Sequence, residues 1–326
     1  MRKHLLYLVL IPATLALLTA TPVVAQELLP YPVSARVISM GQTGAADNSS
    51  PSTIFLNPAN VLGAPRLYAQ GMMVTTNVNS TDYWIQRANA GSTWKMGSAV
   101  TLGFDLSYAK LHHRNDTVYS NHQLDEDMLG LAAGVGLVSG TNDFLLGVAV
   151  KSYTRNSEWR DNTEMYSMSQ NEDANAIDAG FEVRNRATLQ GWDINSAMGA
   201  AVVNAGPDTD NQFNAGLNVR MVSPPVEVLS AHVPLIAFCA SFDAALPDEG
   251  EWVWMVGTEL SVAQMLFLRS GIQTYTGSEN PDPSLATWGA GVGIPISRLR
   301  ARLDYGRRGE YYGKFEHYEF TLEWTL

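Results

Sequence analysis

Three histidines, a glycine-rich run and one cysteine are the residues whose types most suggest chemistry. His112, His113 and His122 lie close together in sequence, but no carboxylate or thiol completes a spacing typical of a metal site. The run at 289–293 has the glycine content of a phosphate loop, yet no helix pattern follows it. Cys239 is the only cysteine, and its apolar surroundings favour an inert thiol. No catalytic triad or dyad stands out, so we expect no metal, no cofactor and no enzyme activity.

Charged residues at every second position near the C-terminus form a second set that could bind a ligand or form ion pairs. Arg298, Arg300, Arg302 and Asp304 share one face of a predicted strand, because side chains in a strand alternate between faces. Further charges on comparable polar faces are Glu319, Glu323, Asp105, Lys151, Asp193, Arg220, Glu259 and Arg269. Cross-strand ion pairs from the arginines to the two C-terminal glutamates follow from this pattern. The set is interpreted either as a charge network that fills a narrow lumen or as a polar conduit or small-ligand site.

The elements that carry these residues are strands with a period of two. Residues 286–296 place apolar side chains at even positions, and the odd positions are mainly glycine. The last strand alternates Tyr318, Phe320, Leu322, Trp324 and Leu326 with polar residues up to the C-terminus. An apolar face opposite a charged face, with many tryptophans and tyrosines, is typical of a barrel wall between lipid and water.

The alternation predicts an all-β fold, a transmembrane antiparallel β-barrel of about fourteen strands. The expected strands cover residues 68–77, 83–90, 96–111, 128–138, 143–153, 179–185, 189–203, 213–222, 234–245, 251–262, 265–275, 285–296, 299–306 and 315–326. Short connections alternate with longer polar ones, among which 112–127 and 154–178 are predicted outer loops. The connection at 223–232, with Pro224 and Pro225, is long for its side.

A soluble β-sandwich is the alternative fold, because it also has many short alternating strands. The predicted strands are longer than the usual five or six residues of soluble strands, and glycines such as Gly199, Gly216 and Gly289 lie on the polar face. Long strands and a crowded interior favour the membrane barrel.

The ends of the chain define its organisation and destination. Residues 1–25 have a basic start, an apolar run and small residues before a cleavage site, which is typical of a signal peptide. Residues 26–67 show no persistent alternation and are predicted to plug or border the barrel, which spans 68–326. The formal net charge of −11 disfavours nucleic acid as a partner. These features predict a bacterial outer-membrane location with membrane lipid as a partner.

Two short motifs in the N-terminal segment suggest a family. Residues 34–41 read S-A-R-V-I-S-M-G, and a small acidic stretch leads to Asn57, Pro58, Ala59 and Asn60. This order resembles the N-terminal signature of the PorV/PorQ family and, more distantly, of the FadL fatty-acid transporters. The closing hairpin, with residues 303–306 and 315–326, is similar as well.

The resemblance implies a hatch at Asn57–Asn60 and leaves several functions open. The PorV/PorQ likeness implies a component of protein export or surface attachment, with secretion-machinery or surface proteins as partners. The FadL likeness implies passive uptake of a small hydrophobic ligand. A structural barrel or adhesin that acts through its outer loops is a third hypothesis. From the residues alone, Pro58 lacks an N–H and breaks a strand ladder, which an ordinary loop turn would also explain.

Two departures from the family pattern concern the outer loops and the C-terminus. The segment 154–178 is rich in Glu, Asp, Asn and Met, whereas a fatty-acid groove requires apolar loops. The last residue is Leu326, and the nearest aromatic residue is Trp324. The first departure weakens a fatty-acid substrate specifically.

Overall fold

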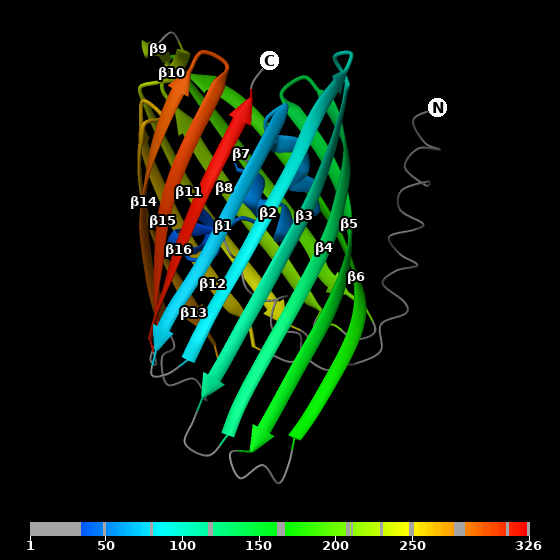
Figure 1. Ribbon diagram of the computed structural model, residues 1–326. Helices are drawn as coiled ribbons and strands as arrows, with labels where there is room; N and C mark the ends of the chain where they lie inside the picture. The colour runs from blue at the N-terminus through cyan, green and yellow to red at the C-terminus, as the bar shows by residue number, and fades with distance from the viewer. Residues whose placement is uncertain are drawn as a thin grey trace, which may run out of the picture.

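The computed structural model describes residues 34–47, 50–78, 81–116, 120–161, 167–206, 209, 211–228, 231–247, 251–276, 284–310 and 313–324. Fourteen strands of this part of the chain close into an antiparallel barrel, and a short helical segment lies inside it (Figure 1). The predicted signal peptide at 1–25 and the terminal residues Thr325 and Leu326 lie outside the described residues. The prediction of an all-β barrel of about this size is confirmed.

The wall consists of strands that pair with their neighbours in sequence, except around the hairpin β9–β10. Their bounds are β1 Leu67–Val78, β2 Thr81–Met96, β3 Val100–Asp116, β4 Ser120–Ser139, β5 Asn142–Asp161, β6 Ser167–Leu189, β7 Trp192–Ala205, β8 Gln212–Val222, β11 Ile236–Pro247, β12 Val253–Val262, β13 Leu266–Tyr275, β14 Ser284–Ile296, β15 Leu299–Glu310 and β16 Gly313–Trp324. The barrel closes where β1 pairs with β16, with Leu67 opposite Trp324. Closure pairs the backbone N–H and C=O groups at the edges of both end strands, as a lipid environment requires.

The outer surface of the barrel carries the apolar half of the sequence alternation. On β14, Trp288, Val292, Ile294 and Ile296 are each about half exposed, while Gly289, Gly291, Gly293 and Pro295 are buried. Exposed tryptophans lie near both ends of the strands, at Trp94 and Trp324 on one side and at Trp254 and Trp288 on the other. Apolar walls between aromatic girdles are typical of barrels embedded in a membrane.

The two ends of the barrel differ in the lengths of their strand connections. Short turns at residues 140–141, 190–191 and 297–298 lie at the upper end in Figure 1, where β16 also ends. Strands β3 to β6 extend beyond the others at the opposite end (Figure 1). Because short turns face the periplasm in such barrels, the extended end faces outward.

The predicted outer loops at 112–127 and 154–178 are largely strand, and this prediction is wrong. β6 was expected only at 179–185, yet it runs for 23 residues and pairs with β5 up to Arg160 opposite Ser167. The outward faces of these extensions are polar, as at Asn171, Asp173 and Asn175, so they lack the apolar outward alternation from which strands were predicted. His112, His113 and His122 therefore lie on β3 and β4, where the His112 Nδ1 is 2.7 Å from Asp125 Oδ1.

The long connection at 223–232 also contains regular structure. β9 (Pro225–Val228) and β10 (Ala231–Pro234) form a small two-stranded sheet at the end with the short turns (Figure 1). Pro225 pairs with Pro234, so prolines close the open end of the hairpin. This hairpin explains the length that was anomalous for its side.

The N-terminal segment folds into three short helices inside the barrel, and we call residues 34–64 the hatch. α2 (Ala35–Ser39) is capped by the Ser34 hydroxyl, which accepts a hydrogen bond from Val37 N. Two 3₁₀ helices follow, η1 (Pro51–Phe55) and η2 (Pro58–Gly63), each with a proline in its first turn. None of the helices in the described residues is both long and apolar enough to cross a membrane.

Candidate functional site

The predicted hatch motif lies at the start of η2, against the inner wall. Asn57 caps η2, and its Oδ1 accepts a hydrogen bond from Ala59 N at 3.0 Å. The Asn57 amide donates to the carbonyl of Ala45 at 2.7 Å and to that of Phe181 on β6 at 3.0 Å. Pro58, Ala59 and Asn60 are fully buried or nearly so. The motif therefore joins two parts of the hatch to the barrel wall.

Asn60 makes hydrogen bonds that connect different parts of the hatch. Its amide donates to the carbonyls of Gly44 at 2.8 Å and Thr53 at 3.1 Å. Satisfying buried carbonyls in this way stabilises a segment that has little regular secondary structure of its own. The two asparagines thus explain the polar residues of the motif, and Pro58 supplies the fixed backbone angle at the first helical position.

Glycines on the inner wall allow the hatch backbone to approach the strands closely. A Cβ at Gly147 of β5 would overlap the backbone of Pro58 and Ala59, and one at Gly271 of β13 would overlap Met40 and Gly41. Other wall glycines in comparable contact with the hatch are Gly103, Gly134, Gly180, Gly199, Gly257, Gly289 and Gly306. The glycines expected on the polar face therefore match the path of the hatch around the barrel.

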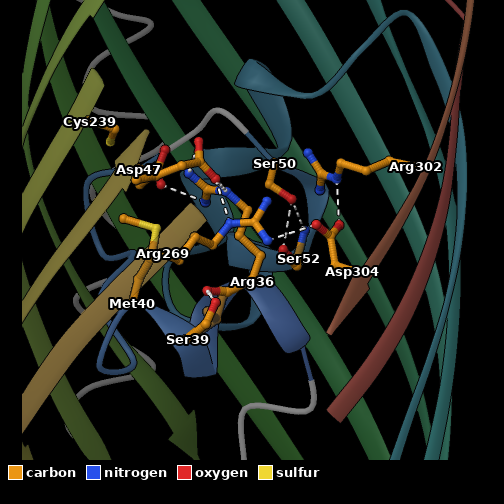
Figure 2. Close-up of polar contacts among 12 residues, drawn as sticks. Arg36, Ser39, Met40, Asp47, Ser50, Ser52, Cys239, Arg269, Arg302 and Asp304 are labelled. Carbon is orange, nitrogen blue, oxygen red and sulfur yellow. Dashed lines mark hydrogen bonds and ion pairs between the residues drawn. The ribbon is translucent and has the colours of Figure 1, made fainter. Parts of the chain in front are cut away.

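Arg36 ties the hatch to the opposite side of the wall through ion pairs (Figure 2). Its guanidinium is 2.6 Å from Asp47 Oδ2 and 3.0 Å from Glu259 Oε2 on β12. Burial alone would lower the pKa of Arg36, but the negative charges of Asp47 and Glu259 raise this pKa by more than burial lowers it, so the net shift is upward. The buried guanidinium therefore stays charged and holds both carboxylates.

The ion pairs continue along the wall as a chain that includes several predicted residues. Arg269 bridges Glu259 and Asp304, at 2.7 Å from each. Arg302 then bridges Asp304 at 2.5 Å and Glu319 at 3.4 Å. Glu319 also accepts a hydrogen bond from the Ser34 hydroxyl at 2.5 Å, which returns the chain to the hatch. We call this set, Arg36, Asp47, Glu259, Arg269, Arg302, Asp304 and Glu319, the charge lock.

The remaining predicted charges lie away from the charge lock. Arg300 pairs with Glu323 at 3.0 Å at the periplasmic end of the lumen. Arg298 is exposed in the turn before β15. Asp193 is exposed at the start of β7, where it accepts a hydrogen bond from the Thr188 hydroxyl. Arg298 and Asp193 were predicted on lumen faces because a period of two extends a strand face into the adjacent turn.

Arg36 and Asp47 were not predicted as site residues. Arg36 stands in the family-like S-A-R motif, so the motif contained a signal, but it gave no indication of the partner on β12. The partners are separated by 223 residues in sequence, and only the barrel topology brings them together.

A cavity of about 260 Å³ lies on the outward side of the hatch. Its lining includes strand ends that face outward, such as Gln212, Pro247 and Tyr275, together with Phe55 and Leu56 of the hatch. Charged residues at its wall are Arg87, Lys151, Asp243 and Arg308. We call this space the outer cavity, and its size suits a small ligand.

Beside the outer cavity, the ladder between β6 and β7 is interrupted. Ile177 pairs with Ala205 and Ala179 with Val202, so Val203 and Asn204 both oppose Asp178. This is a β-bulge, and Asn204 adopts a positive φ of 60° within it. Asp178 accepts from Asn204 N at 2.7 Å and pairs with Lys151 at 2.7 Å, so a buried polar cluster covers the bulge from inside.

On the lipid-facing side of the same wall, a shallow apolar groove of about 480 Å³ crosses β4 to β8. It is lined by small or apolar residues, including Gly147, Gly180 and Val202. Val202 and Phe213 line the groove, whereas their chain neighbours Val203 and Asn214 line the outer cavity. The outer cavity and the groove therefore lie back to back across β7 and β8.

A closed, lipid-facing barrel with a buried hatch defines the class as an outer-membrane β-barrel, and solved structures agree. The toluene transporter TbuX of Ralstonia pickettii has a TM-score of 0.54 and 11% identity over 89% of this chain and 96% of its own. The toluene transporter TodX of Pseudomonas putida has a TM-score of 0.52 and 11% identity, over 93% and 98%. The CymD monoaromatic hydrocarbon channel has a TM-score of 0.51 and 13% identity, over 89% and 96%.

The protein is thus an outer-membrane β-barrel that shares its fold with these hydrocarbon transporters and channels. No protein-family model matches the sequence, and no curated protein is similar to it. The likeness is one of fold, since the identities are low.

Proposed function

We propose that this protein is a FadL-like channel that passes a small hydrophobic molecule through the outer membrane. The molecule enters the outer cavity, meets the hatch and leaves sideways through the wall at the β6–β7 bulge. The single observation that carries this proposal is the position of the outer cavity and the groove on opposite faces of the same strands.

The hatch makes a sideways exit more favourable than a straight one. An axial path would have to break the charge lock, in which Arg36 and Arg269 are almost completely buried. Separating a buried ion pair costs several kcal/mol, about 3–5 in measured cases. Widening the bulge breaks fewer bonds, because the regular ladder is already interrupted between Ile177 and Ala179.

The wall chemistry at the exit also suits an apolar solute. Ala179, Val202 and Phe213 present apolar side chains on the lipid side, where a solute leaving the barrel is most soluble. The Lys151–Asp178 pair on the inner side would have to move aside, which makes it a gate in this proposal. The fold shared with channels described as toluene or monoaromatic hydrocarbon transporters supports the same assignment.

Uptake of radiolabelled toluene by bacterial cells that lack such channels tests the proposal. Expression of the protein is expected to accelerate uptake over the empty vector. Val202→Trp, which fills the groove, should slow uptake, whereas the control Leu268→Trp on lipid-facing β13 should not. Uptake equal to the vector control, with the barrel folded in the outer membrane, would refute the proposal.

A PorV/PorQ-like role in protein export or surface attachment is the second candidate function. The charge lock favours it, because a lumen closed by buried ion pairs suits a protein that binds partners on its surface. The hairpin β9–β10 offers a periplasmic surface for such a partner. Replacing residues 225–234 with a short glycine-serine turn should abolish co-purification of a periplasmic partner under this hypothesis, and should leave toluene uptake unchanged under the first.

A further inference from the structure

Arg87 of β2 is a buried cation at the wall of the outer cavity. Its side chain is only 6% exposed, and the guanidinium lies 3.6 Å from the centre of the Phe55 ring of η1. One terminal nitrogen is 3.9 Å from the Met128 sulfur, which is a weak acceptor. Its Nε has no hydrogen-bond partner among the described residues.

The carboxylates nearest to Arg87 are engaged elsewhere. Asp105 and Asp178 attract its charge at longer range, but within the described residues neither is close enough to form a salt bridge with it. Asp105 accepts hydrogen bonds from the Tyr68 hydroxyl at 2.5 Å and the Asn89 amide at 3.1 Å. Asp178 is held by Lys151 and Asn204. The guanidinium therefore lacks the bidentate partner that buried arginines usually have.

A buried charge without a close counterion is unfavourable, so its presence calls for a compensating ligand. The contrast with Arg36, Arg269 and Arg302 is informative, since each of these contacts a carboxylate at 3.0 Å or less. Among the described charged residues that line the outer cavity with Arg87, Lys151 is neutralised by Asp178, and Asp243 is a carboxylate. Asp243 Oδ2 already accepts from Gly44 N and Ala45 N.

We propose that the outer cavity binds a compact organic monoanion, such as an aromatic carboxylate, with its carboxylate on Arg87. The apolar body of the ligand lies against Leu56, Val203 and Met255, which line the same cavity. The volume of about 260 Å³ fits a single aromatic ring rather than a long acyl chain. This inference rests on the proposed channel function and narrows its substrate from hydrophobic molecules in general to small amphipathic anions.

Binding of benzoate and of its neutral isostere benzamide to the purified protein in detergent tests the inference. Calorimetry should give about 10-fold or tighter affinity for benzoate, because a hydrogen bond to a charged group adds that much. Arg87→Met should remove the preference and keep benzamide binding, while Arg87→Lys should retain part of it. Arg300→Met is the matched control, because it removes a lumen cation from the periplasmic end and should leave the preference intact.

Each outcome decides one of the two claims. If benzoate does not bind the wild-type protein, or binds no tighter than benzamide, the anion site is refuted even where toluene uptake is rapid. The anion site is also refuted if Arg300→Met loses the preference as fully as Arg87→Met. If benzoate binds through Arg87 while neither benzoate nor toluene uptake exceeds the vector control, the site stands and the channel function fails.

Discussion

The hatch packs on wall glycines along both sides of the barrel, and the two sides differ in the ion pairs added to that packing. Along β12 to β16 the glycine contacts are joined by the buried charges of the charge lock, from Arg36 to Glu319. Along β4 to β7 Pro58 and Ala59 pack on glycines, and the Asn57 amide donates a hydrogen bond to the β6 backbone. The bulge and the apolar groove occur on the second side.

This difference indicates that one side fixes the position of the hatch and the other side can open. Ion pairs in a dry lumen are strong but specific in geometry, so they fix the position of the hatch. Where ion pairs do not reinforce the glycine packing, no large or charged side chain has to be displaced, so the wall of β4 to β7 suits a region that opens. The two sides should therefore differ both in their contribution to stability and in their effect on uptake.

The largest effect is expected from Glu259→Ala in the charge lock. The change leaves Arg36 and Arg269 without a shared counterion, which should lower the free energy of unfolding by about 3–5 kcal/mol. Urea titration in detergent measures the loss, and planar-bilayer conductance should rise as the hatch loosens. Unchanged conductance with unchanged stability would mean that the charge lock does not hold the hatch.

A smaller effect is expected from Gly147→Val on the β4 to β7 side. The new side chain overlaps the backbone of Pro58 and Ala59, and such overpacking costs about 1–3 kcal/mol. Gly71→Val is the matched control, because a Cβ at Gly71 meets no atom within 4 Å. Equal thermal stability of the two variants would contradict the close approach of the hatch to β5.

Asp178→Asn should weaken the seal of the bulge. The substitution removes the charge that pairs with buried Lys151 but keeps an oxygen for Asn204 N. Because the isosteric amide fills the same space and Lys151 Nζ keeps its 2.7 Å hydrogen bond to Asn204 Oδ1, the stability loss should be on the order of 1–2 kcal/mol. Toluene uptake should increase, because the proposed gate opens more easily. Hydrogen exchange at the amides of residues 177–179 and 202–204 should also accelerate, whereas slower exchange would contradict this role.

The smallest effect is expected from Arg300→Gln at the periplasmic end. Its pair with Glu323 is partly exposed, since the Arg300 side chain is 29% accessible, and solvent screening reduces such pairs to about 1 kcal/mol or less. The urea midpoint should move little, and toluene uptake should be unchanged. A loss as large as that of Glu259→Ala would remove the distinction between the charge lock and other lumen charges.

The membrane-spanning strands were predictable because lipid on one face imposes a strict period of two. Residues 284–296 show this directly, since Trp288, Val292 and Ile294 are exposed and the intervening glycines are buried. Outside the lipid, the outward face meets water, and the exposed positions Asn171, Asp173 and Asn175 of β6 are polar, so no apolar outward face marks this strand in the sequence. For this reason, the prediction of loops at 112–127 and 154–178 was wrong.

The candidate site was only partly visible in the sequence. Arg302, Asp304 and Glu319 could be placed on one face by alternation, and the structure connects them. The sequence did not indicate the roles of Arg36 and Arg87. The ion pair of Arg36 with Glu259 spans the lumen, and Arg87 is notable only because its buried guanidinium has no close counterion among the described residues. Both properties arise only when the hatch is seated inside the barrel.

Locking the bulge with a reversible disulfide tests the central claim, sideways exit between β6 and β7. Ala179 and Val202 pair across the two strands, so Ala179→Cys with Val202→Cys, in a Cys239→Ala background, allows a cross-strand bond. Leu268→Cys with Ala290→Cys on β13 and β14 is the control pair. Oxidation should reduce toluene uptake only in the first variant, and a reductant should restore it. Uptake that is unaffected by oxidation of the first pair would contradict a sideways exit at this site.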